Sequence, residues 1–411
     1  MDLADKLAPA AAAKLVVGDL ACPDLTLREV GYSASGQRYT STAHPLNAAD
    51  SSKPRTDITT SDVLLVSGGG RGITPLCMAS LAQRMGGGTY VLMGRSALSD
   101  EPAWAQGVTD TGKPLEKAAL GFLKAEFAAG RGAKPTPRAL NKLVGACKGN
   151  REVRESITLI ESRGGRAIYC ACDANEEAQV KATLATVRDK YKLTVTGIVH
   201  AAGIVLDKRV ENKKGEDFDA VFGTKITGLT NLFNCLGDSG RKNLRHLVVF
   251  SSLAGFWGNV GQTDYAMAND ALSKMIHCFG ASVPTCSVRA LCFGPWDGGM
   301  VTPELKAHFK AQGVQIIPRD EGADQVAAMI SMVGADRSQC LIGNWVDPAK
   351  SGGAPVPKTA RIAPTAATAA PDPEPEMLSG SGFGAKGSDL QAEIDYQREQ
   401  AKKYKASGKP L

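Results

Sequence analysis

Hydroxyl groups stand at both ends of a short loop of small residues. The apolar run 247–250 predicts a buried strand, and the strand ends in Ser251 and Ser252. Tyr265 follows thirteen residues after Ser252 and opens a segment with helical spacing. Ligands in open α/β sheets bind at the carboxyl ends of the strands. A serine hydroxyl and a phenol in this arrangement can therefore meet over one small ligand.

The phenol of Tyr265 needs help to act as an acid, because the pKa of a free phenol is about 10. A nearby cation and a hydrogen-bond partner for the phenolate would allow proton donation to an alkoxide near neutral pH. One helical turn after Tyr265 the chain has Asn269 and no lysine, and Lys274 lies on a different face. The cation must come from elsewhere, and Lys225 in the helix predicted over 217–236 is the candidate.

A second chemical motif follows the apolar run 63–66. There the glycine-rich stretch 67–73 leads into a predicted helix. Glycines let the backbone approach a pyrophosphate, and a helix N-terminus offers it free N–H groups. The next predicted strand, 89–96, carries Arg95 near its end, with no acid beside it. A basic residue there accommodates the 2′-phosphate of NADP, so NADPH is predicted over NADH. Taken alone, these features also fit an ordinary strand-to-helix turn and a surface arginine.

Together the motifs resemble the ketoreductase (KR) domains of the short-chain dehydrogenase/reductase superfamily, found in polyketide and polyunsaturated-fatty-acid synthases. These KR domains exchange the positions of the catalytic lysine and asparagine in the way seen here. The resemblance implies that Tyr265 is the proton donor and Ser252 the orienting hydroxyl, since Ser252 has the family's spacing to the tyrosine. It also implies that Lys225 and Asn269 complete the relay.

The resemblance also implies a set of cofactor contacts. The glycine motif departs from the family form, because Ser67 replaces a threonine and Thr74 replaces the last glycine. Asp173 is placed against the adenine by the resemblance, and it fits equally well as the N-cap of the next helix. His200 is expected to be a packed strand residue. The predicted cofactor-binding residues are Gly68, Gly70, Arg71, Gly72, Ile73, Arg95, Ser96, Asp173, Ala174, Ala201, Ala202, Gly203 and Pro295.

The order of apolar runs and helices predicts an α/β fold, a Rossmann-like doubly wound parallel sheet with strand order 3-2-1-4-5-6-7. The domain itself should span 61–347, with a helical insertion at 97–154. Residues 1–60 should form an N-terminal extension with short strands and a linker. Residues 348–387 are rich in Pro, Ala, Thr and Gly, which is typical of a flexible linker, and 388–411 form a charged tail able to become a helix.

Composition narrows the function further. A net charge of +6 spread over 411 residues excludes a nucleic-acid-binding patch as the main feature, and no apolar run has the length of a membrane span. The ten cysteines are scattered without paired Cys-x-x-Cys motifs, so no metal site is predicted. Reduced cysteines favour a cytoplasmic location, with an organelle address left open.

The resemblance implies NADPH-dependent reduction of a 3-oxoacyl thioester to a 3-hydroxyacyl thioester in fatty-acid, polyunsaturated-fatty-acid or polyketide synthesis. The thioester would be borne by an acyl carrier protein or CoA, and other synthase domains or a second copy of the chain are further expected partners. The alternatives are a reductase for a free ketone or alcohol, an inactive NADPH-binding scaffold and a pure interaction module. Asp207 and Trp257 resemble markers of opposite product configurations, so the stereochemistry stays open.

Overall fold

The structure, a computed structural model, describes residues 2–3, 8–20, 30–33, 35–40, 58–298, 301–311, 313–331 and 339–343. The chain divides into two compact units, 1–355 and 356–411, and the second lies outside the described residues. The expected linker at 348–387, the charged tail at 388–411 and the larger part of the expected linker before residue 61 therefore also lie outside them.

Near the N-terminus, the described residues of the first unit include a helix and a small sheet. The helix is α1 (Pro9–Leu20), and three two-residue strands form the sheet in the order β1 (Asp2–Leu3), β2 (Gly31–Tyr32) and β3 (Arg38–Tyr39). Strand β2 pairs in parallel with β1 and antiparallel with β3. These three strands lie within residues 1–60, the range predicted to be an N-terminal extension.

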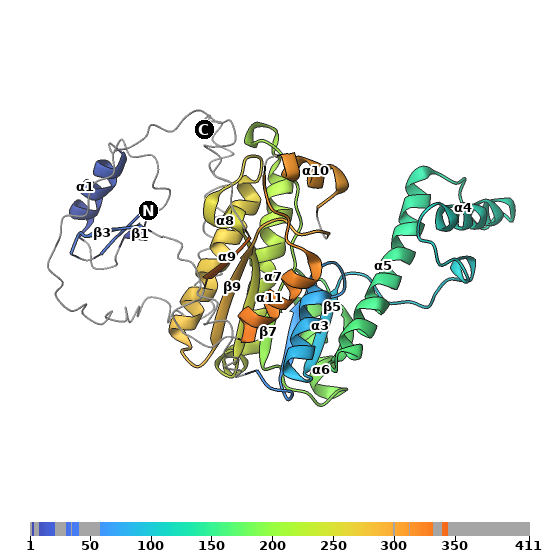
Figure 1. The fold of residues 1–411 in the computed structure, drawn as a ribbon, viewed down its shortest axis with the longest axis horizontal. Coiled ribbons are helices and arrows are strands. Elements are labelled where there is room, and N and C mark those ends of the chain that lie inside the picture. Colours follow the sequence, from blue (N-terminus) through green and yellow to red (C-terminus); the bar gives the residue numbers. More distant parts are fainter. Residues whose placement is uncertain are drawn as a thin grey trace. The chain divides into compact units, whose positions relative to one another are not determined.

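A seven-stranded parallel sheet forms the centre of the fold (Figure 1). Across the sheet the strands lie in the order β6-β5-β4-β7-β8-β9-β10, which reads 3-2-1-4-5-6-7 when the seven are numbered along the chain. Both faces of a parallel sheet are covered, which explains why the strands read as near-continuous apolar runs. The strands are β4 (Val63–Ser67), β5 (Thr89–Gly94), β6 (Arg166–Ala171), β7 (Gly197–His200), β8 (His246–Ser252), β9 (Ser287–Phe293) and β10 (Gln339–Ile342).

Alternate residues of each strand enter two separate hydrophobic cores, as the pleat of a strand requires. Leu64 and Val66 pack with one face, whereas Val63 and Leu65 pack with the other. The first core is covered by α3 (Thr74–Met85), α5 (Pro137–Ser162) and α11 (Arg319–Ser331), and the second by α6 (Glu177–Asp189), α7 (Gly215–Lys242) and α9 (Thr263–Ser282). The predicted Rossmann-like, doubly wound fold is confirmed.

Helix α5 joins the insertion to the body of the domain. Residues 152–162, which end at a Gly-Gly turn, predict a short helix that follows the insertion. In the structure this helix is part of α5, which already begins at Pro137, where the hydroxyl of Thr136 accepts a hydrogen bond from the Ala139 N–H at 3.2 Å. Its first half packs with α4 (Lys113–Ala128) and the short helix η1 (Ala103–Ala105) around a small core of their own. The predicted insertion therefore shares one continuous helix with the helix layer that covers the first core.

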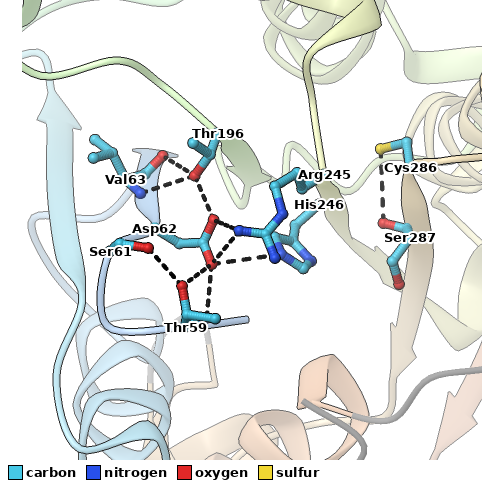
Figure 2. A network of polar contacts seen from close by, with 9 residues as sticks. All are labelled: Thr59, Ser61, Asp62, Val63, Thr196, Arg245, His246, Cys286 and Ser287. Atoms are coloured by element: carbon cyan, nitrogen blue, oxygen red, sulfur yellow. Dashed lines mark hydrogen bonds and ion pairs between the residues drawn. The ribbon is translucent and has the colours of Figure 1, made fainter. Parts of the chain in front are cut away.

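The amino ends of the strands are tied together by a buried carboxylate, shown in Figure 2. Asp62 precedes β4 and is 1% exposed. It accepts hydrogen bonds from the Thr196 hydroxyl at 2.7 Å and from Arg245 Nη1 at 3.0 and 3.2 Å. His246 Nε2, at the start of β8, lies 3.8 Å from it. The network joins β4, β7 and β8 at the edge of the sheet away from their carboxyl ends.

Three shorter helices complete the described fold: η2 (Val210–Asn212), α8 (Leu253–Trp257) and α10 (Pro303–Ala311). Among the described helices, none combines the length and the apolar character that crossing a membrane would require.

Candidate active site

The carboxyl ends of the central strands meet the first turn of α9 and the middle of α7. Tyr265 lies in that first turn and is 8% exposed. Ser252 ends β8, and Asn269 follows one turn along α9. From α7, the buried Lys225 places its Nζ 5.8 Å from the centre of the Tyr265 ring. The structure therefore brings together all four predicted catalytic residues.

The two serines at the end of β8 have different surroundings. Ser252 Oγ caps α8 by accepting a hydrogen bond from the Ala254 N–H at 3.1 Å, and its side chain also hydrogen-bonds Tyr265. Ser251 is buried and donates to the Asn269 carbonyl at 3.0 Å, behind the site. Ser252 is thus the hydroxyl beside the phenol, and Ser251 supports the backbone of α9.

The surroundings of Tyr265 keep its phenol protonated. Burial raises the pKa of the phenol, hydrogen bonds from Ser252 and Asn269 lower it, and the charge of Asp207 raises it again. Asn269 also donates from Nδ2 to the Tyr265 carbonyl at 2.7 Å, which fixes the turn between them. A protonated, buried phenol next to a serine hydroxyl can donate a proton to an oxygen atom placed between them.

Lys225 supplies a cation beneath this pair. Burial lowers the pKa of its amine to about 8, so the side chain is largely charged at neutral pH. Its Nζ donates to the Phe250 carbonyl at 2.8 Å. A Cβ atom on Gly203 would come within 3.3 Å of Nζ, so the glycine leaves the amine room.

His200 connects the glycine-rich turn to the backbone of α7. Its Nε2 lies 2.8 Å from the Lys225 carbonyl and its Nδ1 lies 2.7 Å from the Ser67 hydroxyl. Burial lowers the pKa of the imidazole to about 3, so the ring is neutral. Because a carbonyl only accepts, Nε2 carries the proton and Nδ1 accepts from Ser67. His200 is the packed strand residue that the sequence predicts, and it fixes the stretch of α7 that carries Lys225.

A cavity of about 210 Å³ lies at the carboxyl ends of β4 to β7. The four predicted catalytic residues do not line it themselves, but two lining residues adjoin them: Gly203 lies next to Lys225, and Ile204 packs in the cluster that contains Tyr265. Gly68 turns with a φ of 68°, and a Cβ there would lie 2.9 Å from the Cα of Ala202, so two backbones meet closely. The guanidinium groups of Arg71 and Arg95 supply positive charge. Nine of the predicted cofactor residues line the cavity: Gly68, Gly70, Arg71, Arg95, Ser96, Asp173, Ala174, Ala202 and Gly203.

Four predicted cofactor residues are not among those lining the cavity. The Gly72 N–H donates to Glu152 at 2.9 Å, and Ile73 packs against the first core. The Ala201 N–H donates to the Ser67 carbonyl, and the Pro295 carbonyl accepts from Ile317.

Asp173 does not cap the following helix, so the N-cap interpretation is wrong. Glu176 occupies the N-cap of α6, while the Asp173 carboxylate accepts from the Asn175 N–H at 3.0 Å.

Other residues that line the cavity are Ser67, Met93, Gly94, Val153, Tyr169, Cys172, Asn175, Ile204 and Thr224. Thr224 could have been predicted as a lining residue because it precedes Lys225 in the chain. Val153 could not, because it lies on α5, whose start the sequence does not reveal. In the part of the chain that the structure describes, no three metal-ligating side chains gather.

Comparisons with known proteins agree with this geometry. Residues 63–297 match the protein-family model described as the KR domain. The chain is 49% identical over 352 residues to one of the subunits of the polyunsaturated fatty acid synthase of Thraustochytrium sp., covering 85% of this chain and 12% of that protein. It is 31% identical over 260 residues to spectinabilin polyketide synthase system protein NorB of Streptomyces orinoci, covering 61% and 11%. The chain thus spans only a small part of these relatives.

Solved structures share the fold. A ketoreductase domain from the bacillaene assembly line matches with a TM-score of 0.55 and 23% identity, over 80% of this chain and 66% of that one. An A1-type ketoreductase matches with a TM-score of 0.57 and 22% identity, over 83% and 59%. With the family model covering more than half of its length, the chain belongs to the ketoreductase (KR) domain family of the short-chain dehydrogenase/reductase superfamily.

Proposed function

We propose that this protein uses NADPH to reduce a 3-oxoacyl thioester, borne by an acyl carrier protein, to the 3-hydroxyacyl thioester. The observation that carries the proposal is the buried Tyr265, with Ser252, Asn269 and Lys225 around it, next to a cavity that holds two arginines. The names of the relatives, which are proteins of a polyketide synthase and of a polyunsaturated fatty acid synthase, support a thioester of a growing acyl chain as substrate.

The cavity fits a phosphorylated dinucleotide. The turn at Gly68 and the N-terminus of α3 offer backbone N–H groups to a pyrophosphate. Arg71 and Arg95 suit a 2′-phosphate, and the neighbours of Arg95 are Gly94 and Ser96 rather than an acid. When bound in this cavity, NADPH supplies the hydride that goes to the ketone carbon.

The residues around the phenol handle the oxygen of the ketone. Ser252 donates a hydrogen bond that holds the oxygen in place, and Tyr265 gives it the phenolic proton as negative charge develops. The charge of Lys225 stabilises the phenolate that remains until a proton returns from solvent. Asn269 holds the turn of α9 on which the phenol is mounted.

The experiment is NADPH consumption with an acetoacetyl thioester, followed by absorbance. Tyr265→Phe should lower turnover by about a thousandfold, because it removes the proton donor and leaves the cavity intact. NADPH binding, measured by fluorescence, should stay within about twofold of the unsubstituted protein. Unchanged turnover in this variant would remove Tyr265 from the mechanism.

The same assay separates the alternatives. A larger kcat/KM for a free ketone than for its thioester would assign a small-molecule reductase. NADPH binding without turnover of thioester or ketone would assign a scaffold, and a failure to bind NADPH would point to an interaction module.

A further inference from the structure

A buried ion pair lies directly before the proposed proton donor in the chain. Lys213 Nζ is 2.6 Å from Asp264 Oδ1, and the two side chains are 5% and 1% exposed. The same amine donates to the Leu206 carbonyl at 3.0 Å. Burying two charges costs desolvation free energy, which their attraction offsets only in good geometry. A buried pair is therefore weak evidence of a role in stability alone, and its place beside Tyr265 suggests a role at the site.

The pair joins two elements that border the site. Lys213 follows η2, in the segment that leads from β7 to α7, and Asp264 lies in the first turn of α9. Asp264 Oδ1 also accepts the N–H of Tyr265 at 2.8 Å, so the carboxylate that holds Lys213 also holds the backbone of the phenol-bearing residue. A movement of Lys213 would therefore shift Asp264 Oδ1, and with it the backbone of Tyr265.

Two further contacts run alongside the ion pair. Gln262 Nε2 donates to Asp207 Oδ2 at 3.0 Å, and the Lys208 N–H donates to the Gly261 carbonyl at 3.0 Å. All three contacts join the segment 206–213 to α9 or to the residues just before it, and the ion pair is the contact in which both partners are charged and buried.

We propose that Lys213 and Asp264 form a positioning pair, which holds the segment 206–213 against α9 and balances the charge beside Tyr265, and so sets the readiness of the phenol to give up its proton. This inference rests on the proposed function, in which Tyr265 is the proton donor.

The charged groups around the phenol determine in which direction each partner of the pair would shift the pKa of Tyr265. On α7 there is Lys225, and on the segment after β7 there is Asp207, whose charge raises the pKa of Tyr265. Cys292 on β9 lies near Lys225 and interacts with its charge, and α8 carries no titratable residue in its sequence. Without Lys213, the carboxylates of Asp207 and Asp264 would both oppose the phenolate. Without the charge of Asp264, the amine of Lys213 would favour the phenolate.

The test follows the alkaline limb of kcat for thioester reduction, which reports the proton donor in the substrate complex. Lys213→Met should move the limb up by about one pH unit and lower kcat near neutrality by about tenfold. Asp264→Asn should move the limb in the opposite direction. The double variant, which removes both charges, should return the limb close to its original position, and Lys213→Arg should leave it there.

A matched control comes from the same segment. Lys208 Nζ pairs with Asp217 at 2.7 Å in a more exposed position, where solvent screens its charge, so Lys208→Met removes an equal charge and should leave the limb in place. Shifts of both single variants in one direction, or a double variant as impaired as the worse single variant, would overturn the electrostatic role and leave only a contribution to folding.

Hydrogen exchange separates this proposal from the proposed function. Lys213→Met should speed amide exchange over residues 204–214 and in the first turn of α9, whereas Lys208→Met should do so less. A protein that reduces no ketone refutes the proposed function and the role in proton donation, while exchange still reports whether the pair holds the segment. Exchange in Lys213→Met that matches the unsubstituted protein would overturn the positioning pair even in an active enzyme.

Discussion

Burial of Lys225 brings the pKa of its amine close to physiological pH. The residue is 3% exposed, and burial lowers the pKa of its amine to about 8, from an unfolded-state value of about 10.5. The folded protein therefore binds fewer protons than the unfolded chain between these two values. The cost that this group imposes on folding is complete below pH 8 and disappears as the pH rises through the window, because the unfolded chain then also loses the proton. Catalytic support changes in the opposite sense, since only the charged amine stabilises a phenolate.

We therefore expect kcat/KM for thioester reduction to fall on the alkaline side of about pH 8, where free Lys225 loses its charge. Lys225→Met should abolish this limb and lower kcat/KM at neutral pH by about a hundredfold. The matched control is Lys274→Met on α9, a half-exposed lysine paired with Asp270, which should leave both the limb and the rate unchanged. A limb that persists near pH 8 in Lys225→Met would mean that another group titrates there.

Arg95 is proposed to read the 2′-phosphate. Arg95→Ala should lower kcat/KM with NADPH by about tenfold to a hundredfold, because it removes a charge-assisted contact, and should change kcat/KM with NADH much less. Steady-state kinetics with both nucleotides measure the ratio. Arg131→Ala, which changes an exposed arginine of the insertion paired with Glu126, serves as the control. An equal loss with both nucleotides would show that Arg95 acts on the shape of the cavity.

At the scale of elements, the sequence predicted what depends on a residue type at a fixed spacing. The strand before Ser252, the helix that begins near Tyr265 and the glycine turn at Gly68 all follow from local patterns, and the fold class is confirmed. Residues such as Val153 and Tyr169 were missed because they reach the cavity wall from elements distant in the chain. Their role depends on tertiary packing, which no local spacing encodes.

Helix α5 is an example of an element whose contacts with the cavity depend on tertiary packing. Gly149 lies on α5 where the guanidinium of Arg71 crosses it, and a Cβ there would lie 2.8 Å from Arg71 Nη1. The same helix holds the glycine-rich turn, because Ser156 donates to the Gly70 carbonyl at 3.0 Å and Glu152 accepts from the Gly72 N–H. The predicted insertion therefore contacts Arg71 and the glycine-rich turn through a helix that it shares with the domain.

Gly149→Ala should weaken NADPH binding by about threefold to tenfold, because the new methyl group displaces the end of the Arg71 side chain from its place in the cavity. Gly145→Ala, one turn earlier on α5, meets nothing within 4 Å and should leave NADPH binding unchanged. Both substitutions should gain up to about 1 kcal/mol of helix propensity, so thermal unfolding alone does not distinguish them. Fluorescence titration with NADPH does, and equal affinities in the two variants would remove α5 from the cofactor site.

For the molecule as a whole, the two edges of the sheet carry different tasks. The carboxyl ends of the strands hold the residues proposed for catalysis, with a buried lysine and a loosely satisfied amide in Asn269, whose Oδ1 lacks a hydrogen-bond partner within the described part of the chain. At the amino ends, the Asp62 carboxylate accepts hydrogen bonds from Thr59, Thr196 and Arg245 (Figure 2). Stability is therefore expected to depend on one edge and chemistry on the other.

Asp62→Ala tests this separation. It removes the acceptor shared by the Thr59 N–H, the Thr196 hydroxyl and the Arg245 guanidinium, and it should lower the free energy of unfolding by about 3 kcal/mol, because buried partners lose their bonds together. NADPH affinity and kcat, measured well below the unfolding transition, should stay within about twofold, since the cavity lies at the other end of the strands. Asp100→Ala removes a fully exposed partner of Arg154 and should change the unfolding free energy by less than about 1 kcal/mol. A loss of kcat in folded Asp62→Ala would mean that the strands transmit the change along their length, and that the two edges are coupled.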